Sequence, residues 1–266
     1  MPTIHTFSAA SMLRRTIDMT FRPFRCHADG LTLLAVFVAF SATALRGADT
    51  TVTKSALESD PHGWQDILPA ADLAGWYRVA VPPTGKLGRE QWHLDAGGEV
   101  LICDGDGGHD MLLTSKEYGD AIFHFEFRYE KIAGKTGYNS GAYVRNSKDG
   151  AIWHQAQFGD AKDGYLFGET RTAAGGKKFF TTKDEVRDNR VQPAGQWNTL
   201  EVTARGRTLT LWVNGAVTSR YRNCGVARGH IGLEGEGYRI EFRNLKVKPL
   251  TAGATGVGEG PSGSPR

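Results

Sequence analysis

The sequence predicts an all-β fold of the sandwich or jelly-roll type. Short segments of alternating apolar and polar residues recur through the chain, as in residues 121–129, where three Phe residues alternate with polar ones. Glycine is abundant, with 34 residues, and much of it stands between such segments. Beyond residue 44, no segment sustains the period of an amphipathic helix. Many short strands joined by glycine-rich turns are typical of an antiparallel sandwich.

Each expected strand follows from its alternation and its flanking turns. The segment 121–129 directs its Phe side chains to one face and a polar set to the other, namely His124, Glu126 and Arg128. Residues 234–237 (EGEG) are expected to form a tight turn, and residues 164–188 an irregular region with a surface loop at 175–178. The other expected strands cover residues 91–94, 99–103, 199–204, 208–213, 216–221, 229–233 and 238–247.

The first 44 residues are expected to be a signal peptide. Residues 31–44 form an uncharged apolar run that is short for a membrane span, and four Arg residues precede it. Ala42-Thr43-Ala44 fits a cleavage site, and Met19 is an alternative start that gives a leader of ordinary length. We therefore expect a periplasmic or secreted protein with no stable membrane span after cleavage. An uncleaved membrane anchor is the alternative.

The remainder is expected to hold one domain. We assign residues 45–62 to a linker, 63–250 to a β-sandwich domain and 251–266 to a disordered tail rich in Gly, Ser and Pro. The chain has 32 Lys and Arg against 29 Asp and Glu, and the leader holds four Arg and two Asp. The rest is nearly balanced in charge, so the sequence indicates no nucleic-acid partner. Cys103 and Cys224 could form a disulfide after export or remain buried thiols.

Residues 138–160 carry the strongest indication of a binding site. Alternation places Trp153, Gln155 and Gln157 on one face of a strand, and Tyr143 and Arg145 on one face of another. Aromatic rings beside polar side chains suit a sugar, whose hydroxyls need hydrogen bonds and whose ring has an apolar face. The same pattern also fits the solvated face of a half-buried antiparallel sheet, and that alternative stays open.

A series of short motifs supports a family resemblance that runs from about Gly63 to Leu250. The chain resembles the bacterial 3-keto-disaccharide hydrolase family, whose members are similar in fold to concanavalin A-like lectins and glucanases. The resemblance implies a concanavalin A-like β-sandwich in an exported protein that acts on glycosides with a ketone at carbon 3. The motifs that carry it are Gly75-Trp76, Leu113-Thr114, Tyr118-Gly119-Asp120, Phe125-Glu126-Phe127-Arg128, Asn139-Ser140-Gly141, Arg145, Gln155-Ala156-Gln157, Asp160, Gly195-Gln196-Trp197-Asn198, Val213-Asn214-Gly215 and Ile240-Glu241-Phe242-Arg243-Asn244-Leu245.

Such a substrate sets chemical requirements. The ketone acidifies the proton at carbon 2, so a base can remove it, the enolate can expel the carbon-1 substituent, and water can add back. This route needs a general base, a general acid, and donors or a metal for the enolate oxygen. Direct hydrolysis would instead need two carboxylates across the bond. No cofactor is identified in the sequence, and a divalent metal is compatible with the chemistry.

One position departs from the family pattern. Many family members carry Glu where this chain has Gln155, and an amide cannot exchange a proton as a carboxyl does. His154 is expected to be structural, because alternation places it opposite Gln155. Arg145 is the expected anchor for the ketone or enolate oxygen, with a structural ion pair as the alternative. Glu236 is a further candidate acid or base, and the expected catalytic set is Glu126, Arg145, Gln155, Asp160 and Glu234.

The expected substrate-binding set surrounds these residues and consists of Arg128, Asn139, Tyr143, Trp153, Gln157 and Tyr165. Trp153 could instead lie in the core, and Asn139 could hold a turn. No metal ligands are assigned, because Asp104–Asp110 lacks the bidentate Glu of a calcium loop and the His residues lack paired zinc spacing. Two hypotheses remain: an enzyme of 3-keto-glycoside breakdown, and a non-catalytic carbohydrate-binding module, with an oligosaccharide or glycoside as the partner of either.

Overall fold

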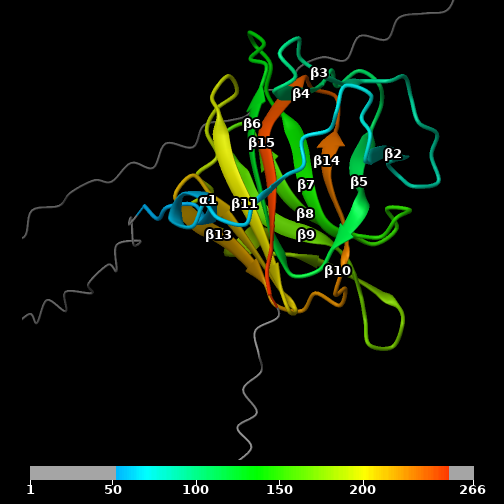
Figure 1. Cartoon of the computed structure of the whole chain (residues 1–266), viewed down its shortest axis with the longest axis vertical. Helices are drawn as coiled ribbons and strands as arrows, with labels where there is room; N and C mark the ends of the chain where they lie inside the picture. Colours follow the sequence, from blue (N-terminus) through cyan, green and yellow to red (C-terminus); the bar gives the residue numbers. More distant parts are fainter. Residues whose placement is uncertain (1–51, 252–266) are drawn as a thin grey trace, which may run out of the picture. The chain divides into compact units, whose positions relative to one another are not determined.

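The computed structural model describes residues 52–251, which form two antiparallel β-sheets packed face to face (Figure 1). The expected signal peptide, the first part of the expected linker and residues 252–266 lie outside the described residues. Within residues 52–251, no helix combines the length and apolar character that a membrane crossing requires. The all-β sandwich predicted from the sequence is confirmed.

One sheet, here called sheet A, has eight strands. Seven follow the order β13-β12-β11-β6-β15-β4-β3, and β1 pairs with β15. The strands are β1 (Gln65–Asp66), β3 (Trp92–Leu94), β4 (Val100–Cys103), β6 (Ala121–Tyr129), β11 (Asn198–Arg205), β12 (Thr208–Val213), β13 (Ala216–Tyr221) and β15 (Ile240–Pro249).

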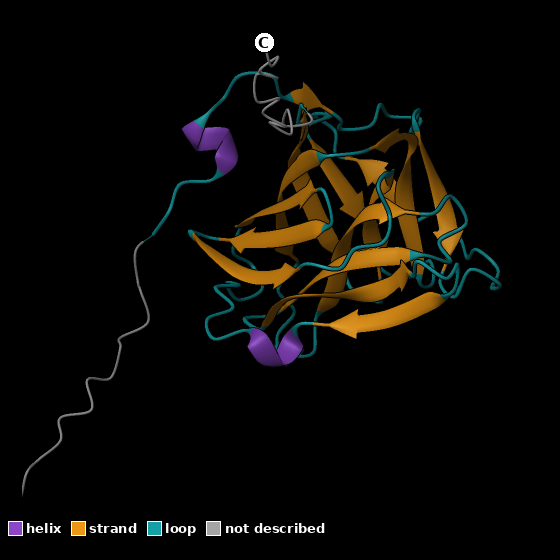
Figure 2. Cartoon of the chain, turned by 90° about the horizontal axis from the view of Figure 1, so that it is seen from below, coloured by secondary structure: helices purple, strands orange, loops and turns teal. Residues whose placement is uncertain are grey.

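The second sheet, sheet B, has seven strands in the order β10-β9-β8-β7-β14-β5-β2. Figure 2 shows strands throughout the two layers, with short helical turns at the periphery; these turns are α1 (Ala56–Ser59) and η1 (Lys183–Glu185). The strands of sheet B are β2 (Trp76–Ala80), β5 (Asp110–Tyr118), β7 (Asn139–Asn146), β8 (Trp153–Gly159), β9 (Asp163–Arg171), β10 (Lys177–Thr181) and β14 (Gly229–Gly235).

The core lies between the sheets and is rich in aromatic side chains. Phe123, Phe125 and Phe127 of β6 point inward and are at most 1% exposed, as their alternation predicts. Phe127 stacks on Phe158 of β8 with ring centroids 4.1 Å apart. These contacts join the two sheets through their central strands.

Two expectations about local structure were wrong in part. Residues 164–188 contain the hairpin of β9 and β10, with Gly175 in its turn. Gly164 and Gly168 fill inward positions of β9, so the apolar alternation is interrupted; a Cβ on Gly168 would overlap the Trp153 carbonyl. The expected turn at 234–237 begins later, because β14 continues through Glu234 to Gly235.

Residues 53–60, expected to belong to a linker, are hydrogen-bonded to sheet A. The Thr53 amide donates to the Gly215 carbonyl at 2.7 Å. Glu201 of β11 accepts from the amides of Ala56 and Leu57 at 2.7 and 3.1 Å. This segment therefore covers part of the outer face of sheet A.

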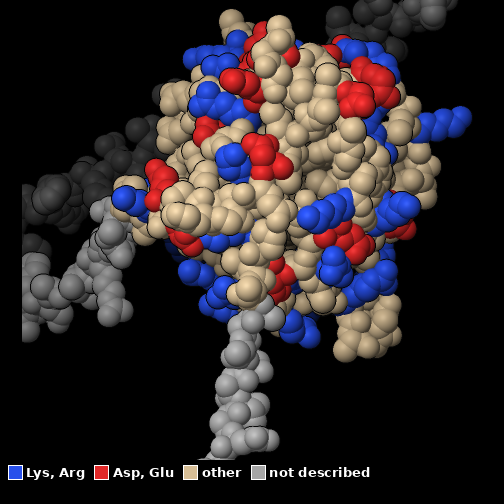
Figure 3. Space-filling model, in the orientation of Figure 1, with Lys and Arg blue, Asp and Glu red and all other residues tan. Residues whose placement is uncertain are grey.

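On the side drawn in Figure 3, Lys and Arg are interspersed with Asp and Glu.

A β-bulge in β7 redirects Arg145. His230 pairs with Asn146 and Gly232 with Tyr143, so two residues of β7 lie opposite one residue of β14. Arg145 takes a positive φ of 53° at the bulge. Its side chain, 1% exposed, forms an ion pair with Asp120 at 2.7 Å, and its Nη1 donates to two backbone carbonyls. The side chain is therefore a structural tie at one end of the core.

His154 lies on the core side of β8, as expected. It is fully buried, with Nε2 3.0 Å from Thr170 Oγ1 and 3.5 Å from Cys224 Sγ. Burial lowers the pKa of His154 to about 4. Cys224 and Cys103 are buried free thiols, which decides between the two alternatives for the cysteines.

His154 is expected to make folding sensitive to acid. An unfolded imidazole has a pKa near 6.5 and the folded one about 4, so the unfolded state binds more protons between these values. The stability is present above pH 6.5 and is lost as the pH falls toward 4. Urea unfolding of the wild type and His154→Gln at pH 7.5 and 5 should differ in pH dependence by about 2 kcal/mol. Equal dependences would contradict this assignment.

Arg145→Met should lower the free energy of unfolding by roughly 2–4 kcal/mol, because it leaves the Asp120 carboxylate without its ion-pair partner and two backbone carbonyls without the guanidinium donor. The exposed Arg205→Met is the matched control and should change it by less than about 0.5 kcal/mol. Chemical denaturation measures both variants. An Arg145 variant as stable as the control would show that the tie contributes nothing.

Candidate functional site

The outer face of sheet B carries a pocket of about 460 Å³, a size that suits a small ligand. Its lining combines a polar floor with apolar walls. The lining residues are Val81, Pro82, Pro83, His109, Met111, Asn139, Tyr143, Gly150, Trp153, Gln155, Gln157, Tyr165, Phe167, Glu234 and Glu236.

The strand order explains this arrangement. Tyr165 and Phe167 come from β9 on one side of the pocket, and Val81–Pro83 follow β2 on the other. Strands β8, β7, β14 and β5 lie between them, and β8, β7 and β14 supply most of the polar floor. Trp153 of β8 meets Phe167 edge to face at 4.9 Å, which extends the aromatic wall.

Glu234 of β14 occupies the centre of the floor and is 3% exposed. Its Oε1 accepts from the Tyr143 hydroxyl at 2.6 Å and lies 2.9 Å from His109 Nε2. Its Oε2 accepts from the Gln155 amide at 2.6 Å. Burial and the negative charge of Glu234 raise the pKa of Tyr143 well above its usual value, so Tyr143 stays a hydroxyl donor.

A chain of hydrogen bonds runs from Glu234 around the floor. Gln155 donates to Gln157 Oε1 at 2.8 Å, Gln157 donates to Asn139, and Asn139 donates to Glu236 Oε2 at 2.5 Å. Glu236 Oε2 lies 3.8 Å from His109 Nε2, which closes the ring. These side chains hold one another in place, which gives the floor a defined geometry.

Gly141 allows Gln155 to reach Glu234. Gly141 belongs to β7, the strand between β8 and β14. A Cβ on Gly141 would overlap the Gln155 amide, so the bare backbone leaves the space that this side chain crosses. The Asn-Ser-Gly motif therefore contributes to the site both through the Asn139 amide and through the missing side chain of Gly141.

His109 is held by the residue after it. Asp110 begins β5 and is 1% exposed; it accepts from Trp92 and Gln91 at 2.9 Å and from Arg78 at 2.5 Å. The pairing of β5 with β14 places Asp110 opposite Gly235. His109 therefore comes to lie beside both carboxylates of the 234–236 segment.

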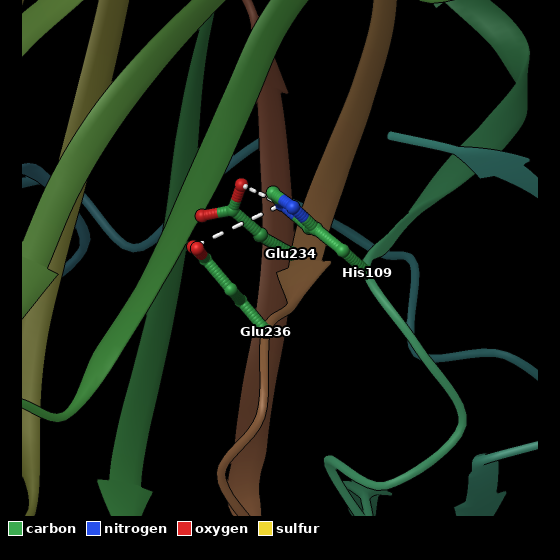
Figure 4. Close-up of side chains that lie close together, drawn as sticks. All are labelled: His109, Glu234 and Glu236. Carbon is green, nitrogen blue, oxygen red and sulfur yellow. Dashed lines mark hydrogen bonds and ion pairs between the residues drawn. The ribbon is translucent and has the colours of Figure 1, made fainter. Parts of the chain in front are cut away.

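His109, Glu234 and Glu236 point toward one another (Figure 4). Burial opposes the charge on His109, but the hydrogen bond to Glu234 and the nearby carboxylates outweigh it and raise the His109 pKa. Burial and the charge of Glu234 raise the pKa of Glu236, against the opposing effects of His109 and Asn139. Burial likewise raises the pKa of Tyr165.

The structure brings together seven of the residues selected from the sequence: Asn139, Tyr143, Trp153, Gln155, Gln157, Tyr165 and Glu234. Four others lie outside the pocket. Glu126 binds Arg243 and Arg128 binds Glu241, both on the outer face of sheet A. Asp160 accepts from the Ala194 amide in a loop. Arg145 is the buried tie described above, so the pocket contains none of the expected cationic anchors.

The pocket also contains His109 and an apolar wall of Val81–Pro83 and Phe167, which were not expected from the sequence, and Glu236, which was not in the expected catalytic set. The signal for Glu236 was its two-residue spacing from Glu234, which places both on one side of an extended chain. His109 needs knowledge that β5 pairs with β14, which no local pattern supplies.

Gly141→Ala should displace Gln155 and lower the free energy of unfolding by about 1–3 kcal/mol through overpacking. Gly176→Ala is the matched control, since its added methyl meets only an ordinary contact at 3.5 Å. Urea unfolding compares the stabilities, and a crystal structure of the variant checks the Gln155 position. An undisturbed Gln155 in the Ala variant would show that Gly141 is not required.

The solved structures with a related fold include proteins that are named for an action on carbohydrates or for binding them. A candidate glycosyl hydrolase from Parabacteroides distasonis is 15% identical, with 76% of this chain and 100% of that chain covered and a TM-score of 0.50. The carbohydrate-binding module CBM66 from Bacillus subtilis is 15% identical over 65% and 95% of the two chains, at a TM-score of 0.45. The β-glucanase of Bacillus licheniformis is 12% identical, with 67% of this chain and 94% of that chain covered and a TM-score of 0.44.

No curated protein matches the chain significantly. The profile of the 3-keto-alpha-glucoside-1,2-lyase-like domain matches residues 63–248. The match supports a carbohydrate-related function, glycosidase-like or carbohydrate-binding, and the sandwich is of the concanavalin A-like type, as the family resemblance implied. Because the matched region is more than half of the chain, the protein belongs to the family of 3-keto-alpha-glucoside-1,2-lyase-like domains.

Proposed function

We propose that this protein is exported and cleaves glycosides that carry a ketone at carbon 3, by elimination followed by hydration, in the pocket on sheet B. The observation that carries the proposal is the pair of carboxylates in a half-enclosed polar floor, beside an aromatic wall, in a member of this family. The apolar run and the A-x-A site before residue 45 support export.

The pocket offers both kinds of contact that a sugar requires. Trp153, Tyr165 and Phe167 provide ring surfaces for the apolar face of a pyranose. The amides of Asn139 and Gln157 line the floor, where a hydroxyl can exchange hydrogen bonds with them. A sugar ring can thus lie along the aromatic wall with its hydroxyls toward the floor.

Glu236 is the proposed base. Both oxygens of Glu234 already accept hydrogen bonds, whereas within residues 52–251 no hydrogen bond engages Glu236 Oε1. Glu236 would take the proton from carbon 2, the electron pair would form the bond between carbons 1 and 2, and the carbon-1 oxygen would leave with the proton from Glu236. Water would then add its hydroxyl to carbon 1 and a proton to carbon 2, so the net reaction is hydrolysis.

The placement of the carboxylates favours elimination over direct displacement. Direct hydrolysis uses two carboxyl groups on opposite sides of the glycosidic bond. Glu234 and Glu236 are two residues apart in sequence, at the end of β14, so they approach a substrate from the same side. Gln155 replaces the Glu of many family members, but the pocket keeps two carboxylates that can exchange protons. The Gln155 amide donates a hydrogen bond to one of them, Glu234.

The test is incubation of the full chain with a 3-keto-disaccharide, with release of the two sugar fragments followed by chromatography. Wild type should turn over, and Glu236→Gln should reduce kcat at least about a hundredfold while still binding the disaccharide. Glu169→Gln is the matched control and should keep wild-type turnover, because Glu169 of β9 pairs with Lys177 and does not line the pocket. No turnover together with saturable binding would establish the alternative, a carbohydrate-binding module.

A further inference from the structure

We propose that His109, Glu234 and Glu236 bind a divalent first-row cation, and that this cation holds the ketone oxygen of the substrate. Cation binding by the three side chains does not depend on a sugar in the pocket. The contact between the cation and the ketone oxygen rests on the proposed function.

The geometry of the three side chains suits a single ion. His109 Nε2 lies 2.9 Å from Glu234 Oε1 and 3.8 Å from Glu236 Oε2, and the potential ligand atoms all lie within 4.8 Å of one another. Ligands at about 2.0–2.2 Å from a common ion are separated by about 3–4 Å. A small closure of Glu236 would therefore complete the three-ligand set around one cation.

The charge of the pocket also favours a cation. Glu234 is 3% exposed and Glu236 is half-buried, yet among the described residues that line the pocket none is Lys or Arg. His109 is the only basic side chain among those lining residues, so it cannot balance two carboxylates. Buried carboxylates are normally paired with cations or metal ions, and a divalent ion would balance this pair.

Hydrogen-bond donors orient the two carboxylates, as is usual for side chains that bind a metal ion. Tyr143 and Gln155 fix the two oxygens of Glu234, and Asn139 fixes Glu236 Oε2. Hydrogen bonds of this kind orient ligands and tune their basicity. Three donors from two strands therefore present the carboxylates to the position where the ion would lie.

The donor set indicates the class of ion. One imidazole and two carboxylates are suited to Mn²⁺, Fe²⁺ or Zn²⁺, whereas Ca²⁺ prefers a larger set of oxygen ligands. Three protein ligands leave positions for substrate or water. An ion in the pocket can bind the ketone oxygen and stabilise its enolate, while the second oxygen of Glu236 remains for proton transfer.

The experiment titrates MnCl₂ and ZnCl₂, separately, into the EDTA-treated full chain at pH 8 in an isothermal calorimeter, without sugar. Neutral imidazole is the ligand form, which sets the pH. One saturable site is expected. His109→Ala and Glu236→Gln should weaken binding at least about tenfold, and Tyr143→Phe should weaken it by a smaller factor. His93→Ala is the matched control, since His93 is exposed and lies 3.8 Å from Asp104, away from the pocket.

Circular dichroism and thermal melting confirm that each variant is folded, and a metal-dependent rise of the melting temperature in wild type and His93→Ala but not in His109→Ala gives a second readout. Binding that is absent in folded wild type, or equal in wild type and His109→Ala, overturns the site. Full turnover of the 3-keto-disaccharide by metal-free protein overturns the role of the cation and leaves the proposed function standing. Metal binding without turnover leaves the metal site standing and overturns the proposed function.

Discussion

The arrangement of the pocket depends on the burial of one carboxylate, Glu234, in the middle of a sheet. A carboxylate shielded from water is costly unless donors surround it. The backbone of β14 is paired with β5 and β7, so the donors must be side chains. Tyr143 comes from β7, Gln155 crosses Gly141 from β8, and His109 precedes β5. Side chains from three neighbouring segments thus surround one buried charge.

Both sheets contribute to the core, but their outer faces differ. Sheet A supplies one side of the aromatic core, and its outer face carries ion pairs such as Glu126 with Arg243 and is partly covered by residues 53–60. Sheet B supplies the other side of the core and leaves its outer face for the pocket. The same alternation that buries Phe158 in the core therefore directs Gln155 and Gln157 to the ligand side.

Local alternation was sufficient to predict the fold and part of the site. The Phe residues of β6 and the polar face of β8 have their period in the sequence itself. The prediction for Arg145 was wrong in its placement, because a bulge shifts the alternation of β7 by one residue. His109 could not be predicted, since its proximity to Glu234 arises from the pairing of strands that are more than a hundred residues apart.

The walls and the floor of the pocket differ in how they are built. The floor is a closed ring of side chains in which each residue restrains the next, whereas Phe167 and the Val81–Pro83 segment come from β9 and the end of β2, outside that ring. Under the proposed function, substitutions in the walls can therefore alter which sugar or aglycone the pocket admits without disturbing the ring of side chains beneath. Under that function, descendants of this sequence could change their selectivity by small steps in the walls while each intermediate kept an intact floor.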